Sequence, residues 1–264
     1  MRIVLPKGGL GDELCFTPSI RELRRRMPRE KLILETVKYP AVWELNPHLP
    51  GGETDCGLSM FAYHDKEIDA GALTRKFARQ FGIELLQDTP EIFLSKEELA
   101  VDLGVQDWKR TIAIDTWATW PSRRWPGDRY VELVKQLTAK GWRIIEIGKH
   151  DGPRIPAERS YMAKLTIRQT AVLLSRCSFY LGNDSGLFHL AAAVGTPQVI
   201  VFGPIEPRKR AYWNTVGARS PEDCNKECFQ TCKESPSGAR CLTEISVEDV
   251  LTAFELAAGR FKRS

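Results

Sequence analysis

Short apolar runs alternate with segments of helical periodicity along the whole chain. In the first part, strands are predicted at residues 2–6 and 31–37, and helices at residues 11–27, 69–82 and 95–104. From residue 111 the alternation restarts, with strands at 111–116, 143–148, 179–184 and 198–203 and helices at 128–141, 166–177, 186–195 and 246–261. We expect Ser246 to cap the last of these helices. Strands separated by helices form parallel sheets, so the sequence predicts an α/β protein with two doubly wound domains facing one cleft.

The restart of the pattern predicts a domain boundary near residues 103–110, with one domain over 1–104 and a second over 105–264. A chain of 264 residues can supply two modest cores. The longest apolar stretch, residues 190–203, is broken by Gly and Pro, and the first residues resemble a strand rather than a cleavable leader. We therefore expect a cytoplasmic protein, or one resting on the inner face of a membrane.

Open parallel sheets bind ligands beyond the carboxyl ends of their strands, which selects the loops at residues 6–13, 115–126 and 183–186. In the third loop, Asp184 or Ser185 can cap the following helix, and Gly186 lets a ligand approach closely. The backbone N–H groups of such a helix start suit a diphosphate. His189 is either placed to reach a phosphate or sugar hydroxyl, or packs under the helix.

Two other enzyme classes fit these loops poorly. A hydrolase is rejected, because the third loop lacks G-x-S-x-G and places its Ser, His and Asp in one helical turn. The first loop has a glycine-rich turn made by Gly8, Gly9 and Gly11. It departs from the G-x-G-x-x-G spacing of a dinucleotide site, so a dehydrogenase ranks low although Glu35 lies near its ribose-binding position.

The first two loops also carry charged groups with a chemical interpretation. Asp12 falls in the first turn of a helix, where the dipole keeps a carboxylate ionised and basic, or where it only stabilises that turn. The second loop offers Thr119, Arg123 and Arg124 between tryptophans. Paired arginines can neutralise a pyrophosphate; alternatively they are an exposed pair beside Trp125, which anchors the loop. Further basic clusters at residues 21–31 and 207–210 suit an anionic partner.

The chain has seven cysteines, an odd number, and cytosolic redox conditions argue against a disulfide scaffold. Four of them follow the spacing C-x3-C-x3-C-x8-C: Cys224, Cys228, Cys232 and Cys241. This group is interpreted either as a structural Zn or Fe site or as four reduced thiols. The remaining three, Cys15, Cys56 and Cys177, are expected to fill the core.

Three stretches together resemble glycosyltransferase family 9, the ADP-heptose:lipopolysaccharide heptosyltransferases. They are GGLGDELCFTP at residues 8–18, RRWP at 123–126, and DSGLFHLAA at 184–192, the last followed by GTPQVIVFGP at 195–204. The similarity runs in the family's order from residue 2 to about residue 250. It implies a GT-B fold, two Rossmann-like domains of which the second holds most of the nucleotide-sugar.

The resemblance also implies roles for individual residues. Asp12 matches the general base that deprotonates the acceptor hydroxyl, and Arg123 and Thr119 match donor-binding positions. The donor loop is matched by Asp184, Ser185, Gly186 and His189. Inverting transfer of this kind requires no catalytic cofactor when positive groups and a helix start stabilise the diphosphate, and the chain contains no D-x-D motif.

The expected donor is a nucleotide-diphospho-sugar, with ADP-heptose favoured, and the expected acceptor is an anionic glycan of lipopolysaccharide-core type or another hydroxyl compound. The alternatives are a protein, nucleic-acid or small-molecule acceptor, or a nucleotide-sugar-binding protein without transfer; retention of Asp12 argues against the last. The chain departs from the family pattern in a shorter N-terminal domain and in offering only Asp151 for contact with the ribose.

Overall fold

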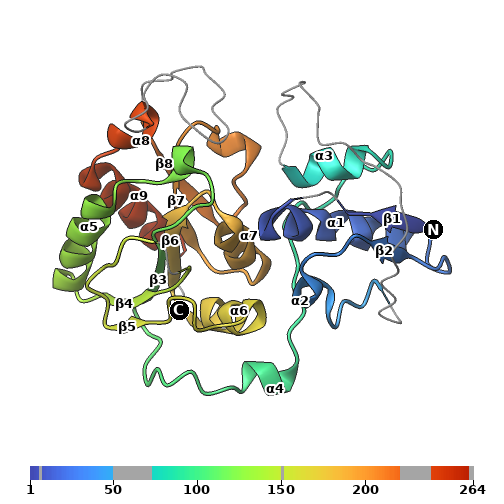
Figure 1. The fold of residues 1–264 in the computed structure, drawn as a ribbon, viewed down its shortest axis with the longest axis horizontal. Coiled ribbons are helices and arrows are strands. Elements are labelled where there is room, and N and C mark those ends of the chain that lie inside the picture. Colours follow the sequence, from blue (N-terminus) through green and yellow to red (C-terminus); the bar gives the residue numbers. More distant parts are fainter. Residues whose placement is uncertain (6–7, 50–72, 150–151, 221–238, 262–264) are drawn as a thin grey trace.

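The computed structural model describes residues 1–264 except 6–7, 50–72, 150–151, 221–238 and 262–264. Figure 1 shows two α/β units side by side, a smaller N-terminal one and a larger C-terminal one. They are joined by the segment that contains α4 (Lys96–Leu99). The predicted boundary at residue 104 falls between the two sheets, and its position remains a prediction.

The C-terminal unit is built on a six-stranded parallel sheet. Its strands are β3 (Thr111–Asp115), β4 (Arg143–Glu146), β5 (Arg159–Ser160), β6 (Phe179–Asn183), β7 (Gln198–Phe202) and β8 (Thr215–Arg219). The order is β5-β4-β3-β6-β7-β8, so the direction of winding reverses between β3 and β6. Every residue of β3, β6 and β7 is buried, as expected for central strands covered on both faces.

Helices cover both faces of this sheet. One core cluster joins α5 (Gly127–Ala139) and α9 (Val247–Arg260) to the sheet through residues such as Leu133 and Phe254. The other contains α6 (Ile167–Arg176) and α7 (Gly186–Ala193) and continues into the N-terminal unit. The predicted cap of α9 is confirmed, because the Ser246 hydroxyl accepts a hydrogen bond from the Asp249 N–H at 3.1 Å.

The N-terminal unit is built on a short parallel sheet. Its elements are β1 (Arg2–Val4), α1 (Leu10–Arg26), β2 (Ile33–Glu35), α2 (Pro40–Trp43) and α3 (Leu73–Arg79). Within the described residues its sheet has two parallel strands, β1 and β2, which fall within the two strands predicted at residues 2–6 and 31–37. The helix predicted over 95–104 is reduced to the single turn of α4, none of whose residues is buried.

The sequence pattern does not predict several short elements: α2, β5, β8, η1 (Pro121–Arg123), η2 (Pro207–Lys209) and α8 (Arg240–Thr243). The two strands lie at the edges of the sheet, where only one side pairs with a neighbour. Strand β8 carries a glycine and only two buried residues, so its sequence has no clear apolar pattern. Its extended conformation depends instead on pairing with β7. In the described part of the chain, no helix is both long and apolar enough to cross a membrane.

Candidate functional site

The predicted ligand-binding loops gather at the carboxyl ends of β3 and β6, where the winding of the sheet reverses. Asp115 is the last residue of β3, and Asp184 and Ser185 lie between β6 and α7. Open α/β sheets bind ligands at this kind of switch point, because the loops on either side diverge there. The second and third loops identified in the sequence therefore meet at one place.

The start of α7 has no side-chain cap. Ser185 occupies the N-cap position, as predicted, but its side chain accepts no hydrogen bond from the first helical turn. Its hydroxyl instead donates to Asp115 Oδ2 at 3.2 Å. The Ser185 hydroxyl therefore leaves the backbone N–H groups of the first turn of α7 uncapped.

Arg123 and Asp184 form an ion pair at this edge. The guanidinium Nη1 of Arg123 lies 3.3 Å from Asp184 Oδ2, and the Asp184 side chain is 2% exposed. Burial opposes ionisation of Asp184, but the nearby guanidinium groups of Arg123 and Arg210 outweigh it and hold the pKa of this carboxyl below its usual value. The Arg123 guanidinium also lies over the Trp120 ring, 4.2 Å from its centroid. A positive group is thus fixed beside the start of α7.

The neighbouring residues of the second loop have a different arrangement. The Arg124 guanidinium stacks on Trp117, 3.4 Å from the ring centroid, and donates to the Ala118 carbonyl at 2.7 Å. It therefore holds its own loop in shape, while Thr119 is exposed. Trp125 anchors the loop as expected: it is buried, and its indole N–H donates to the Ile245 carbonyl at 2.9 Å. Donor binding by Arg124 and Thr119 remains a prediction.

The first loop places Asp12 at the start of α1. Asp12 Oδ2 accepts a hydrogen bond from the Gly9 N–H at 2.7 Å. A Cβ atom on Gly8 would lie 2.2 Å from the same oxygen, so a glycine is required there for the carboxylate to reach this position. Asp12 is half-buried, whereas Glu13 is buried and accepts from the Trp43 indole N–H at 2.8 Å. Of the two adjacent acids, Glu13 holds the segment that follows β2, and Asp12 remains partly accessible.

The starts of α1 and α7 are in direct contact, which brings the first and third loops together (Figure 1). A Cβ on Gly11 would lie 2.6 Å from Cδ2 of His189 and 3.6 Å from Cα of Gly186. A Cβ on Gly186 would meet Leu10 at 3.2 Å. These glycines allow the close approach of two helices, which brings the first turn of α1, where Asp12 lies, to the first turn of α7.

Behind this contact lies a buried polar network. The His189 Nδ1 shares hydrogen bonds with the Tyr212 hydroxyl at 2.7 Å and with the Cys15 thiol at 3.3 Å. Burial lowers the pKa of His189 to about 3 and raises that of Cys15 to about 12, so both side chains are neutral at pH 7. Cys15 was expected only to fill the core, and that expectation is incomplete because its thiol bonds to two polar groups across the two units.

Three residues of this region were not singled out from the sequence. Asp115 and Tyr212 contact predicted site residues directly, and Arg210 lies close enough to influence the charge of Asp184. An acidic residue that ends a buried strand at the reversal of the sheet is a signal that could have identified Asp115. Arg210 was visible only as part of a basic cluster, and nothing in the sequence placed Tyr212 beside His189.

Several predicted positions lie outside the described residues: Cys56, Asp151, Cys224, Cys228 and Cys232. Cys241 is described and lies buried in α8. Cys177 is buried, as expected for a core residue. Among the described residues no three His, Cys, Asp or Glu side chains gather as a set of metal ligands.

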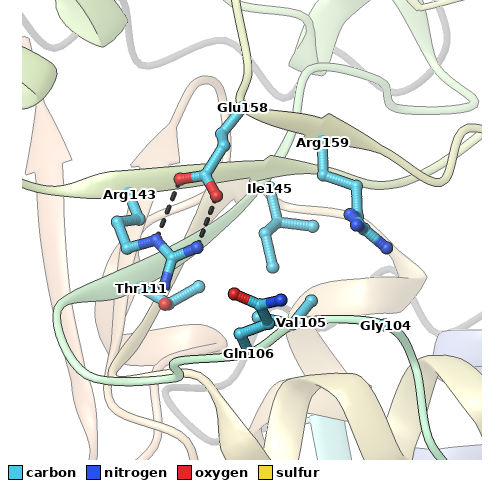
Figure 2. Close-up of a pocket in the computed structure, with 8 residues that line it drawn as sticks. All are labelled: Gly104, Val105, Gln106, Thr111, Arg143, Ile145, Glu158 and Arg159. Atoms are coloured by element: carbon cyan, nitrogen blue, oxygen red, sulfur yellow. Dashed lines mark hydrogen bonds and ion pairs between the residues drawn. The ribbon is translucent and has the colours of Figure 1, made fainter.

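A cavity of about 260 Å³ lies at the opposite end of the sheet, near the amino ends of β3 and β4 (Figure 2). Its charged groups already bind other groups of the protein, since Arg143 forms a bidentate ion pair with Glu158. Arg159 donates to the Leu103 carbonyl at 3.4 Å. We therefore place the candidate site at the contact of α1 and α7 and not in this cavity.

Gly11→Ala should destabilise the protein by about 1–3 kcal/mol and reduce activity, because the added methyl forces α1 and α7 apart. The matched control is Gly259→Ala in α9, where a Cβ meets nothing within 4 Å. That change should stabilise by up to about 1 kcal/mol, through helix propensity. Chemical denaturation of both variants tests the pair. Equal stability of the two variants would show that the glycine contact at α1 is not tight.

Stability should depend on pH through Asp115. Burial raises the pKa of this carboxyl from 3.8 to about 7, although the Trp117 N–H and Ser185 oppose the rise. Between about pH 4 and 7 the group therefore ionises in the unfolded chain but stays protonated in the folded one, so stability falls as the pH rises through this window. The advantage of Asp115→Asn over the natural chain in Tm should grow across it and then level off. A difference in Tm between Asp115→Asn and the natural chain that does not vary with pH would contradict the raised pKa of Asp115. Asp249→Asn, at the start of α9, is the control for a change of Asp to Asn elsewhere in the protein.

The chain has two α/β units, each with a parallel sheet, that meet at the starts of α1 and α7. Arg123 places a positive charge beside the start of α7. This arrangement is that of the GT-B class. The chain belongs to glycosyltransferase family 9 (heptosyltransferase), whose family model matches residues 62–237. The resemblance noted in the sequence is thereby confirmed.

Individual relatives are similar over part of their length. Lipopolysaccharide heptosyltransferase 2 of Salmonella typhimurium is 34% identical over an alignment of 100 residues that covers 33% of this chain and 29% of that protein. Lipopolysaccharide heptosyltransferase 1 of Escherichia coli is 30% identical over an alignment of 93 residues that covers 32% of this chain and 29% of the relative. The aligned part is thus less than a third of either relative.

Solved structures extend the similarity of fold to nearly the whole chain. ADP-heptose LPS heptosyltransferase II of E. coli superposes with a TM-score of 0.71 at 17% identity, covering 98% of both chains. The iron-containing dodecameric glycosyltransferase TibC of enterotoxigenic E. coli gives a TM-score of 0.77 at 18% identity, covering 98% of this chain and 78% of its own. The GT-B fold expected from the sequence is therefore confirmed.

Proposed function

We propose that this protein transfers a sugar, with a heptose favoured, from a nucleotide-diphospho-sugar to an acceptor hydroxyl, with inversion at the anomeric carbon. The observation that carries the proposal is the contact between α1 and α7. It brings the first turn of α1, which carries the partly accessible Asp12, to a helix start without a side-chain cap that is flanked by Arg123. A base for the acceptor and an anion site for the leaving diphosphate are the two groups that such a displacement needs.

In this mechanism Asp12 takes the proton of the acceptor hydroxyl as its oxygen attacks the anomeric carbon. The bond from that carbon to the diphosphate oxygen breaks on the opposite face, and the nucleoside diphosphate leaves with the bonding electrons. The N–H groups at the start of α7 and the Arg123 guanidinium stabilise the charge that develops on it. Asp184 orients Arg123, to which it is paired at 3.3 Å. No step requires a metal or other cofactor.

ADP-heptose is the proposed donor and a lipopolysaccharide-core glycan the proposed acceptor, since the similar proteins are named for these compounds. We place the reaction in the cytoplasm at the inner face of the membrane, where basic clusters such as residues 207–210 favour an anionic surface. Protein, nucleic-acid and small-molecule acceptors, or binding without transfer, are the competing outcomes.

A thermal-shift screen across ADP-, UDP-, GDP- and dTDP-linked sugars tests the donor, because a ligand of the folded state raises the Tm. We expect the largest shift with the ADP-linked heptose. A shift without product release in the presence of lipopolysaccharide-core acceptor would favour the binding-only alternative. The absence of a shift with every donor would overturn the proposal.

We also propose that Cys224, Cys228, Cys232 and Cys241 hold a structural Zn or Fe ion. Four thiolates suit either metal, Cys241 is buried, and the similar protein TibC is described as iron-containing. Elemental analysis of protein purified without chelator should find close to one metal per chain, and Cys228→Ser should lose most of it. Absence of metal would leave four thiols, with little effect of Cys228→Ser beyond local packing.

A further inference from the structure

Asp115 links three parts of the candidate site. Its side chain is buried at the end of β3, with 3% of the residue exposed. Oδ1 accepts a hydrogen bond from the Trp117 N–H at 3.0 Å, and Oδ2 accepts one from the Ser185 hydroxyl at 3.2 Å. A Cβ on Gly148 would lie 2.5 Å from Oδ1, and Gly148 has a φ of 122° that favours glycine. The fold thus makes room for a carboxyl group at this position and directs it to the helix start.

The bond to Asp115 is at odds with the usual behaviour of an N-cap serine. A serine in this position normally accepts from an N–H of the first helical turn, which is worth about 1 kcal/mol. Ser185 has the extended backbone of an N-cap residue, with φ −134° and ψ 178°, so rotation of its side chain alone would bring the hydroxyl to that turn. One hydroxyl therefore has two alternative partners, Asp115 and the backbone of α7.

A separate observation indicates that the helix start is kept for a ligand. The carboxylate oxygens of Asp184 are buried and accept no hydrogen bond within the described residues. The Asp184 carboxylate forms an ion pair with the adjacent Arg123, and it does not cap α7. Charged groups of both signs are thus assembled beside N–H groups that the N-cap side chain leaves uncapped.

We propose that Asp115 is a positioning residue that keeps the Ser185 hydroxyl away from the first turn of α7. The N–H groups of that turn then remain available to the diphosphate of the donor. This inference rests on the proposed function, and it adds that the availability of the anion site depends on a side chain from a different strand. Without Asp115, the Ser185 hydroxyl turns inward, caps α7 and competes with the phosphate oxygens.

The test is a double-variant comparison of binding, with inorganic pyrophosphate and ADP as probes in isothermal titration calorimetry. Asp115→Ala should weaken binding of both about fivefold, the ratio that corresponds to one side-chain cap. Adding Ser185→Ala to Asp115→Ala removes the competing hydroxyl and should recover most of this loss. In the Ser185→Ala background, therefore, Asp115→Ala should have little effect. Loosening of the site by a cavity would instead give the same loss in both backgrounds.

Asp115→Asn provides rescue by a conservative change. Its Oδ1 keeps the Trp117 N–H bond, and its Nδ2 donates to the Ser185 hydroxyl oxygen, so the hydroxyl stays in place and affinity should remain close to that of the natural chain. Thermal melting checks that each variant is folded. If Asp115→Ala does not melt cooperatively, Asp115→Thr replaces it, because threonine preserves the branched shape but is too short to reach Ser185.

The outcomes separate this inference from the proposed function. Failure of the natural chain to bind pyrophosphate, ADP or any nucleotide-sugar would overturn both. Binding by the natural chain, together with equal losses from Asp115→Ala in the two backgrounds, would overturn the role of Asp115 alone. A loss in the natural background that Ser185→Ala reverses supports the inference.

Discussion

Asp12→Asn should lower the turnover number by about 10²- to 10⁴-fold, the range expected for loss of a positioned proton acceptor. The fold should survive, because the amide oxygen of asparagine can still accept the Gly9 N–H that Asp12 Oδ2 accepts at 2.7 Å. Donor affinity should change little, since the proposed donor groups lie on the C-terminal unit. The change therefore removes the base while leaving its surroundings in place.

Initial rates and donor Kd for Asp12→Asn measure the two effects separately. Asp249→Asn is a matched control, because Asp249 also occupies the third position of a helix and its carboxylate also accepts from the N-cap N–H. That residue lies at the start of α9, in a helix to which the mechanism assigns no role. Near-normal turnover of Asp12→Asn would mean that Asp12 only stabilises the first turn of α1, and the mechanism would be wrong.

Arg123→Ala should weaken donor binding and slow transfer, and it should also destabilise the protein. The guanidinium stabilises the diphosphate in the bound state and more strongly as charge develops in the transition state. Its removal also leaves the buried Asp184 carboxylate without its ion-pair partner. Breaking a buried pair costs about 3–5 kcal/mol, and we expect the lower end because Arg210 still lies near Asp184.

Two further variants separate the effects of Arg123 on binding and on stability. Arg123→Lys keeps a positive charge, so it should retain more stability than Arg123→Ala while still binding the donor less tightly. Arg143→Ala breaks an exposed ion pair with Glu158 at the far end of the sheet, and it should cost less than about 1 kcal/mol without affecting donor Kd. Unchanged donor Kd for Arg123→Ala would exclude this arginine from the anion site.

The central elements of the fold could be predicted because their patterns are local and strong. The strands β3, β6 and β7 are continuous apolar runs, and α5 and α9 repeat apolar residues at helical spacing. The edge strands β5 and β8 carry no such pattern, since only one side of each pairs with a neighbour. Strands β1 and β2 of the N-terminal unit fall within the ranges predicted from their own apolar runs.

The sequence by itself determined the α/β alternation, the three loops at the carboxyl ends of the strands, and the family to which the chain belongs. It did not determine which side chains within those loops share contacts. Arg123 and Arg124 are adjacent in sequence, yet one pairs with Asp184 and the other holds its own loop. Asp115 and Ser185 are 70 residues apart and share a hydrogen bond. Only the tertiary structure decides such pairings, because they depend on strand order and on the close approach of two glycine-containing helices, which no local pattern encodes.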